Sequence, residues 1–174
     1  MLNIEIVNLI QRITGLAAFF LITLQIFLSS NRKYIKYHML NGILAYTFVF
    51  IHPVLMVVSN YLFSSNFDPF YVYVDACVMC NGTYEYYVNF GRIAFYSVTI
   101  AVIAAKLRNI NTWLKNNWRK LHLLNYIAFY AVSIHAYNIG TDFSKTIFIY
   151  LFWICQLVVL YTLVLKVRQL LISR

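Results

Sequence analysis

The stretch from Tyr37 to Phe63 reads YHMLNGILAYTFVFIHPVLMVVSNYLF and contains no charged residue. A helix of about 20 apolar residues is long enough to cross the hydrocarbon core of a bilayer. Four other stretches have a similar character: Ile4–Leu28, Val88–Leu107, Trp118–Ile139 and Thr146–Val167. The sequence therefore predicts an all-α integral membrane protein, a five-transmembrane-helix bundle.

The composition points to the same class of protein. Hydrophobic residues make up 62% of the 174 residues and charged residues only 11%, less than half of the ~25% that is usual in soluble domains. Five spans leave no room for a second soluble domain, and no G-x-G-x-x-G fingerprint occurs. We expect a single domain over residues 1–174 with no flavin or nucleotide domain, and we see no internal repeat.

The charged residues between the spans predict the orientation. The net charge is +9, and in membrane proteins basic residues gather in cytoplasmic connections, so no nucleic-acid partner is needed to explain them. The first and third connections and the tail contain Arg32, Lys33, Lys36, Lys106, Arg108, Lys115, Arg119, Lys120, Lys166, Arg168 and Arg174. The opposite side contains all five acidic residues, Glu5, Asp68, Asp75, Glu85 and Asp142. We expect the N-terminus outside, the C-terminus in the cytoplasm, and a multi-pass protein surrounded by the lipid of a prokaryotic plasma membrane.

The four histidines fall on two of the predicted spans at two depths. His38 and His52 lie 14 residues apart in the second span, and His122 and His135 lie 13 residues apart in the fourth. A rise of 1.5 Å per residue separates the two depths by ~20 Å. Because both spans run from inside to outside, His38 is expected to pair with His122 near the cytoplasmic face and His52 with His135 further out.

Such pairs suit the axial ligation of haem. Neutral imidazole is a common ligand of haem iron, and ionisable residues inside a bilayer mark functional sites. Zinc needs about four ligands in one shell, which these separated pairs do not offer. We therefore predict that His38, His52, His122 and His135 bind the iron atoms of two b-type haems. An ideal helix rotates His135 by about 220° from His122, so we expect a kink or bulge in the fourth span.

Two motifs resemble the ferric reductase-like transmembrane domain. One is WRKLHLLNY at 118–126 followed by SIHA at 133–136, and the other runs from Tyr37-His38 to Phe50-Ile51-His52-Pro53. That superfamily includes ferric reductases, NADPH oxidases and the haem-binding membrane subunit of the bacterial methionine sulfoxide reductase system. The resemblance covers about Arg12 to Val167, and the oxidase branch also spaces its haem histidines 14 and 13 residues apart. It implies an inner haem on His38 and His122 and an outer haem on His52 and His135.

The resemblance also implies a function. The protein would be an oxidoreductase that passes electrons from a cytoplasmic donor to an extracytoplasmic acceptor. Many members continue into FAD- and NADPH-binding domains, whereas this chain ends at Arg174, so the donor is expected to be a separate flavin reductase, a loosely bound flavin or a quinol. The oxidase branch has a further histidine one turn beyond the outer ligand; Met56 is found here, which argues against superoxide production. The alternative is a non-enzymatic channel, carrier or assembly subunit whose histidines line a polar path.

Several further residues are candidates for cofactor contacts. Haem propionates are anionic and bind basic side chains. Arg12, the only basic residue predicted well inside an apolar helix, and Arg92, near the outer start of the third span, are therefore candidate partners of the outer haem; Arg92 has the alternative of reaching the membrane interface. Phe129 lies at mid-depth and either separates the haems or packs in the core. Gly15 is expected to allow a close helix approach.

Cys77 and Cys80 form a C-x-x-C motif in the longest connection, about Ser64 to Tyr87. No histidine follows the motif, so covalent haem attachment is not indicated. The two cysteines form a small structural disulfide, remain free thiols, or exchange electrons with the outer haem. Cys155, within the fifth predicted span, is expected to be a packing residue.

Overall fold

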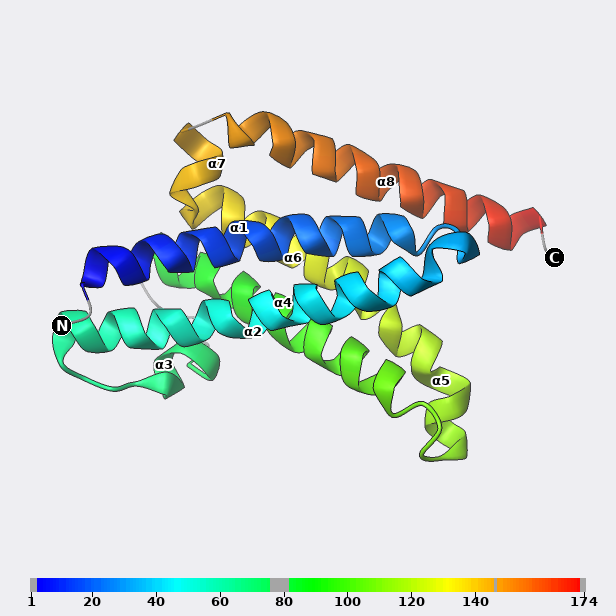
Figure 1. Cartoon of the computed structure of the whole chain (residues 1–174), viewed down its shortest axis with the longest axis horizontal. Coiled ribbons are helices and arrows are strands. Elements are labelled where there is room, and N and C mark those ends of the chain that lie inside the picture. The colour runs from blue at the N-terminus through cyan, green and yellow to red at the C-terminus, as the bar shows by residue number, and fades with distance from the viewer. Residues whose placement is uncertain (1–2, 76–81, 146, 173–174) are drawn as a thin grey trace.

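The structure is a computed structural model that describes residues 3–75, 82–145 and 147–172 (Figure 1). Within these ranges the chain forms helices and no strand. The helices are α1 (Ile4–Leu28), η1 (Arg32–Tyr34), α2 (Ile35–Ser64), α3 (Pro69–Tyr73), α4 (Thr83–Lys106), α5 (Thr112–His122), α6 (Leu124–Ile139), α7 (Thr141–Lys145) and α8 (Phe148–Ile172).

Four helices are long and apolar enough to cross a membrane. They are α1, α2, α4 and, in α8, the segment Phe148–Gln169. Their outward faces are apolar: the side chains of Ile43 in α2 and Leu157 in α8 are 67% and 65% exposed. Helices that present apolar side chains on their outer surface need lipid around them, because they satisfy their own backbone hydrogen bonds and leave little that water could bind. The chain is therefore an all-α membrane protein.

The fourth predicted span is divided between two helices. The α5 helix begins after the N-cap Asn111, whose side chain accepts a hydrogen bond from Leu114 N, and ends at His122. The helix is interrupted at Leu123, and the next helix, α6, has 16 residues. The distortion expected in the span Trp118–Ile139 is present directly after His122. By contrast, α2 remains continuous through Pro53.

The helices form two antiparallel hairpins. The α1 helix packs along α2, and α4 packs along α6 (Figure 1). Helix α8 lies beside α1, and contacts of α1 with α6 and of α2 with α4 join the hairpins. Phe19 lies at the centre of the core, where its ring stacks on Phe129 at 5.7 Å and on Phe152 at 5.6 Å between ring centres. Phe129 therefore packs in the core, as does the buried free thiol of Cys155.

Acidic and basic residues lie at opposite ends of this bundle. The end that includes the start of α1, α3 and α7 contains Glu5, Asp68, Asp75, Glu85 and Asp142, and we call it the acidic end. The α1–α2 connection and the segment from the end of α4 through α5 lie at the other end (Figure 1). This basic end contains Arg32, Lys33, Lys36, Lys106, Arg108, Lys115, Arg119 and Lys120. Lys166, expected in the tail, lies inside α8 instead.

Candidate functional site

The structure brings the four histidines together in two pairs. His38 of α2 faces His122 of α5 near the basic end, with 6.0 Å between ring centres. His52 of α2 faces His135 of α6 nearer the acidic end, with 6.4 Å between ring centres. We call these the basic-end pair and the acidic-end pair. Both pairings are those expected from the sequence.

Each histidine ring is held by a backbone carbonyl of the neighbouring helix in its own hairpin. In the first hairpin, α1 carbonyls lie close to the Nδ1 atoms of α2 histidines: Gln25 O is 3.1 Å from His38 and Gln11 O is 2.9 Å from His52. In the second hairpin the acceptors are in α4. Ala101 O is 3.3 Å from His122 Nδ1, and Tyr87 O is 3.0 Å from His135 Nδ1.

These four contacts favour one tautomer of the imidazoles. A carbonyl oxygen accepts a hydrogen bond but cannot donate one, so it favours a proton on Nδ1 and an unprotonated Nε2. At His122, Nδ1 also lies 3.4 Å from the side-chain amide nitrogen of Asn125, a donor that favours the opposite tautomer. Metal-binding histidines are commonly oriented in this way, by a carbonyl or carboxylate on the nitrogen that does not bind the metal.

The spacing of the rings suits a metal atom between them. A metal held by two imidazole nitrogens at about 2 Å separates the ring centres by about 6 Å, because each centre lies about 1 Å behind its nitrogen. The observed separations are 6.0 and 6.4 Å. Within the described part of the chain, no group of three or more His, Cys, Asp or Glu side chains gathers as a metal site. Each pair therefore suits a metal whose other ligands come with it, as they do in haem.

At the basic-end pair, a side-chain amide lies within hydrogen-bond distance of the Nε2 atom of His38. Gln25 Nε2 lies 3.1 Å from His38 Nε2, and Gln25 Oε1 accepts a hydrogen bond of 2.9 Å from Asn41 Nδ2. A Cβ atom at Gly42 would lie 2.9 Å from the same Gln25 nitrogen, so this glycine makes room for the amide. If His38 binds a metal through Nε2, the Gln25 side chain has to rotate away, which its flexible stem allows.

At the acidic-end pair, both rings lie against backbone that has no side chain. A Cβ atom at Gly15 would lie 2.9 Å from His52 Cε1, and one at Gly91 would lie 2.8 Å from His135 Cε1. Carbon atoms do not approach this closely, so a larger residue at either position displaces the ring. The sequence predicts that Gly15 permits a close helix approach, and the structure shows that the group that approaches is His52.

A cavity of about 520 Å³ surrounds the acidic-end pair. Its volume falls in the range of small-molecule and cofactor sites. The walls include both histidines and both glycines, and they also include the two arginines expected near a cofactor: His52, His135, Gly15, Gly91, Arg12 and Arg92. Met56 also lines the cavity, where its sulfur is 3.1 Å from Gln11 Nε2.

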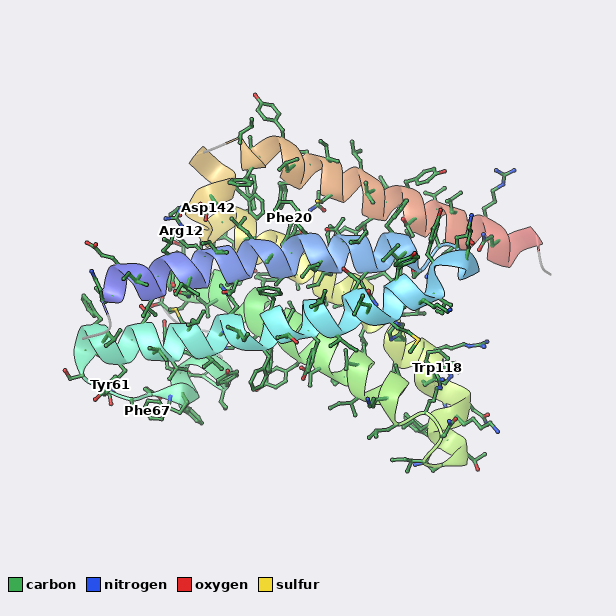
Figure 2. The ribbon with its side chains drawn as sticks, in the orientation of Figure 1. Arg12, Phe20, Tyr61, Phe67, Trp118 and Asp142 are labelled. Carbon is green, nitrogen blue, oxygen red and sulfur yellow. The ribbon has the colours of Figure 1, made fainter. Side chains whose placement is uncertain are left out.

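Arg12 pairs with an acidic residue that the sequence did not suggest as its partner. Its guanidinium bonds both carboxylate oxygens of Asp142, with Arg12 Nε 3.1 Å from Asp142 Oδ2. Figure 2 shows Arg12 of α1 next to Asp142 of α7. The side chain of Arg12 is 52% exposed and that of Asp142 13% exposed. The positive charge at this wall of the cavity is therefore already compensated.

Arg92 of α4 also contributes its charge to the wall of the cavity, but its hydrogen-bond acceptors differ from those of Arg12. Arg92 Nε donates to Val72 O at 2.9 Å, and its other nitrogens bond Tyr71 O and the side chain of Asn89. These acceptors are neutral, and within the described residues no carboxylate pairs with Arg92. Arg92 thus joins α3 to α4 and leaves a net positive charge beside the acidic-end pair.

Helices α1 and α4 correspond residue by residue at the positions that contact the histidines. Gln11, Gly15 and Gln25 of α1 match Tyr87, Gly91 and Ala101 of α4, each 76 residues later. The same register aligns GLAAFFLITL at 15–24 with GRIAFYSVTI at 91–100. On the histidine helices, HMLNGI at 38–43 matches HLLNYI at 122–127. Our expectation of no internal repeat is wrong for these hairpins.

This correspondence is the signal that could have located the residues missed in the sequence. Gln11, Tyr87 and Ala101 contact the histidines through their backbone carbonyls, and Gly91 accommodates His135 because it has no side chain. A backbone carbonyl can come from any residue type, so only the repeated G-x-x-A-F-[FY] pattern marks its position. The repeat extends to hydrogen bonds: Thr23 Oγ1 donates to Phe19 O and Thr99 Oγ1 to Phe95 O, at 3.0 and 2.8 Å.

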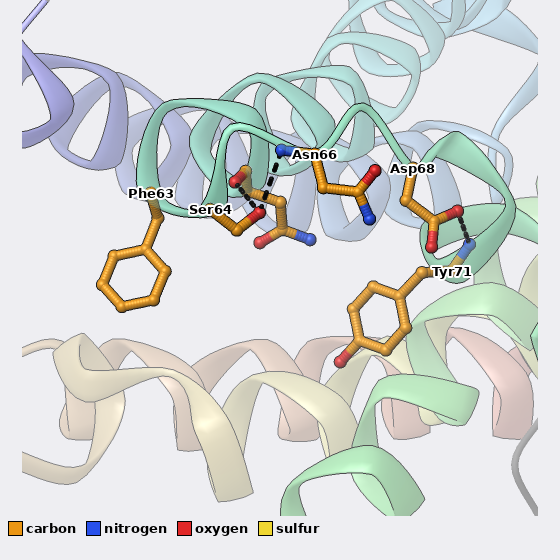
Figure 3. Close-up of a pocket in the computed structure, with 6 residues that line it drawn as sticks. Phe63, Ser64, Asn66, Asp68 and Tyr71 are labelled. Atoms are coloured by element: carbon orange, nitrogen blue, oxygen red, sulfur yellow. Dashed lines mark hydrogen bonds between the residues drawn. The ribbon is translucent and has the colours of Figure 1, made fainter.

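A second, smaller pocket lies at the acidic end, where α2 joins α3 (Figure 3). Its volume is about 240 Å³. Its polar groups serve the local turn: Asn66 N donates to Ser64 Oγ at 3.3 Å and Tyr71 N donates to Asp68 Oδ1 at 3.0 Å. Burial raises the pKa of Tyr71, helped by the charge of Glu85. These contacts explain the conformation of the connection and indicate no ligand.

Cys77 and Cys80 lie outside the described residues, so their role stays a prediction.

No protein-family model matches the chain, and no curated protein or solved structure matches it.

Proposed function

We propose that the protein is a membrane-embedded electron-transfer protein that binds two b-type haems, one between the histidines of each pair. The observation that carries this proposal is the state of the four imidazoles. Each Nδ1 lies within hydrogen-bond distance of a backbone carbonyl, which favours an unprotonated Nε2, and the ring centres are 6.0 and 6.4 Å apart. Four unrelated histidines have no reason to share this arrangement.

The surroundings of the pairs support a planar, anionic cofactor. At the acidic end, Gly15 and Gly91 keep both helices bare beside the rings, and the cavity contains the uncompensated charge of Arg92. When bound, haem iron supplies one-electron oxidation and reduction. The four histidines would hold it, and the backbone carbonyls would orient their imidazole rings. Phe19 and Phe129, both fully buried at mid-depth, fill the space between the two levels.

The proposed topology has five crossings, with the α5–α6 segment as the fourth. The basic end then faces the cytoplasm and the acidic end the outside, because basic residues collect in cytoplasmic connections. This places the N-terminus outside and the C-terminus inside. The resemblance of the histidine motifs favours membership of the ferric reductase-like transmembrane superfamily and a location in a prokaryotic plasma membrane.

The proposed direction of electron flow is from a cytoplasmic donor to an extracytoplasmic acceptor. At the basic end, the guanidinium groups of Arg108 and Arg119 lie 5.5 and 5.6 Å from the Trp118 ring centre, and that ring lies 6.0 Å from His122. This cationic surface beside a ligand of the basic-end pair suits an acidic flavin reductase or the phosphate of a free flavin. A quinol remains the other donor class.

The deciding experiment is purification after expression with added haem precursor. We expect a red protein with a Soret band and, by the pyridine haemochrome assay, two haems per chain. Addition of dithionite should produce the sharp α-band of a low-spin haem with two histidine ligands. The full chain in mild detergent is sufficient for this measurement.

Two other results are informative. One haem per chain would contradict the paired assignment while keeping haem binding. A colourless protein that is folded by circular dichroism would overturn the proposal and leave a channel, carrier or assembly subunit as the alternative.

A further inference from the structure

Lys166 directs its charge into the bundle at the level of the basic-end pair. It lies in α8 and is partly buried. Its Nζ donates to Ser29 Oγ at 2.8 Å and lies 5.6 Å from the centre of the Tyr126 ring. Within the described residues no carboxylate forms an ion pair with it. An ammonium group in an apolar helix is costly unless it has a partner.

Tyr126 supplies a second donor at the same place. Its hydroxyl is buried and makes no hydrogen bond of standard geometry among the described residues, although it interacts with the side chain of Ser29. Buried hydroxyl groups are nearly always hydrogen-bonded, so this hydroxyl has the capacity to donate to a further partner. The hydroxyl lies beside Ser29, the residue that also binds Lys166.

Three helix segments converge here next to the histidines. Ser29 is the C-cap of α1, Tyr126 lies in the first turn of α6, and Lys166 comes from α8. The ammonium group is close enough to act electrostatically on both His38 and His122. The ammonium group of Lys166 and the hydroxyl of Tyr126 therefore meet at the edge of the proposed haem site.

We propose that Lys166 and Tyr126 form a carboxylate-binding site that holds a propionate of the basic-end haem. This inference rests on the proposed function. Ser29 is a positioning residue: its hydroxyl donates to Ile26 O at 2.6 Å and accepts from Lys166, so it orients the ammonium group. A lysine and a tyrosine hydroxyl together give one charge-assisted and one neutral hydrogen bond to a carboxylate. From the sequence alone, Lys166 is interpreted only as one of the basic residues that predict the orientation in the membrane.

The test measures haem release from the purified holoprotein to excess apomyoglobin. The His52→Ala background is used, because it is expected to keep only the basic-end haem. Lys166→Gln should release this haem about tenfold faster, as expected for loss of a hydrogen bond to a charged group. Lys166→Arg should stay close to the parent, and Tyr126→Phe should have a smaller effect. The matched control is Arg168→Gln, an exposed change of the same charge on the same helix, which should leave the rate unchanged.

A second arm replaces haem by its dimethyl ester, which has no carboxylate. The parent protein and the Lys166→Gln variant should then release the cofactor at equal rates. A tenfold difference that persists with the ester would overturn the inference, since the lysine would then act through the fold or another anion, such as a lipid phosphate.

The two proposals fail in different ways. Equal release of ordinary haem from the parent and from Lys166→Gln overturns this inference and leaves the two-haem function intact. Absence of haem from the wild-type protein overturns both.

Discussion

The two histidine pairs have the same ligand chemistry but are enclosed in different ways. The acidic-end pair lies against the bare backbone of Gly15 and Gly91 and opens into a cavity of about 520 Å³. At the basic-end pair, the Gln25 amide touches a ring nitrogen and the helix breaks directly after His122. Space at one end is created by missing side chains, and at the other by side chains that can move. Substitutions should therefore affect the two ends unequally.

The largest expected effect is the loss of one whole cofactor. His52→Ala or His135→Ala should remove the acidic-end haem and leave the other, so that the pyridine haemochrome value falls from two to one per chain. His38→Ala or His122→Ala should do the reverse, because each iron needs both imidazoles. The two classes are distinguished by the midpoint potential of the haem that remains. Loss of both haems from every variant would remove the distinction between the ends.

The next effect is selective for the acidic end. Gly15→Ala and Gly91→Ala should each lower the occupancy of the acidic-end haem by more than half and leave the basic-end haem in place, because the added methyl displaces a ligand ring. Alanine also favours helix by about 1 kcal/mol over glycine, so the fold should remain. The control is Gly42→Ala, whose methyl meets only the movable end of Gln25. Equal haem loss in all three variants would show that the effect is not local.

The two ends should also differ in whether they receive electrons, because the positive charge of the basic end attracts an anionic donor. We expect NADPH alone not to reduce the purified haems, and a flavin reductase with its flavin to reduce them. The rate should fall several-fold as salt rises, because the screening length shortens to ~8 Å near 0.15 M. Stopped-flow absorbance at the Soret band measures this. Fast reduction by NADPH without a partner would place the entry site elsewhere, and a rate independent of salt would remove the role of the basic end.

The smallest effect concerns two equivalent glutamines. Gln25→Ala keeps the carbonyl that holds His38 but removes the amide from its Nε2. A hydrogen bond of about 1 kcal/mol corresponds to roughly fivefold faster haem uptake at the basic end. Gln11→Ala, which removes an amide that contacts the Met56 sulfur at the other end of α1, should leave the uptake rate at the basic end unchanged. Rapid mixing of the apoprotein with haem measures both. Slower uptake by Gln25→Ala would mean that the amide assists binding.

Much of the fold follows from apolar length alone. The first predicted span, Ile4–Leu28, has the bounds of α1, because apolar runs that must cross lipid have few alternatives to a helix. The division of the fourth span at Leu123 is not predictable as a helix end, since the residues on both sides suit a helix. The need for a distortion comes only from the 13-residue spacing of the histidines.

The candidate site is predictable in its ligands and less so in its surroundings. The histidines can be paired because a rare ionisable residue in an apolar run has a known depth. The carbonyls of Gln11 and Tyr87 carry no residue signature. The pairing of Arg12 with Asp142 depends on where α7 turns back over α1, and the inward direction of Lys166 depends on how α8 packs. Both are tertiary properties.

Each pair takes one histidine from the α1–α2 hairpin and one from the α4–α6 half. In the proposed function, neither half of the chain contains a complete set of axial ligands. The free energy of haem binding would therefore also be free energy of association between the halves, by thermodynamic linkage. Removal of the cofactor would first weaken the contact between the hairpins, while each hairpin keeps its own backbone hydrogen bonds and its own carbonyl–imidazole contacts. With the proposed haems, insertion into the membrane and final assembly would thus be separable stages, and the supply of haem would control the second.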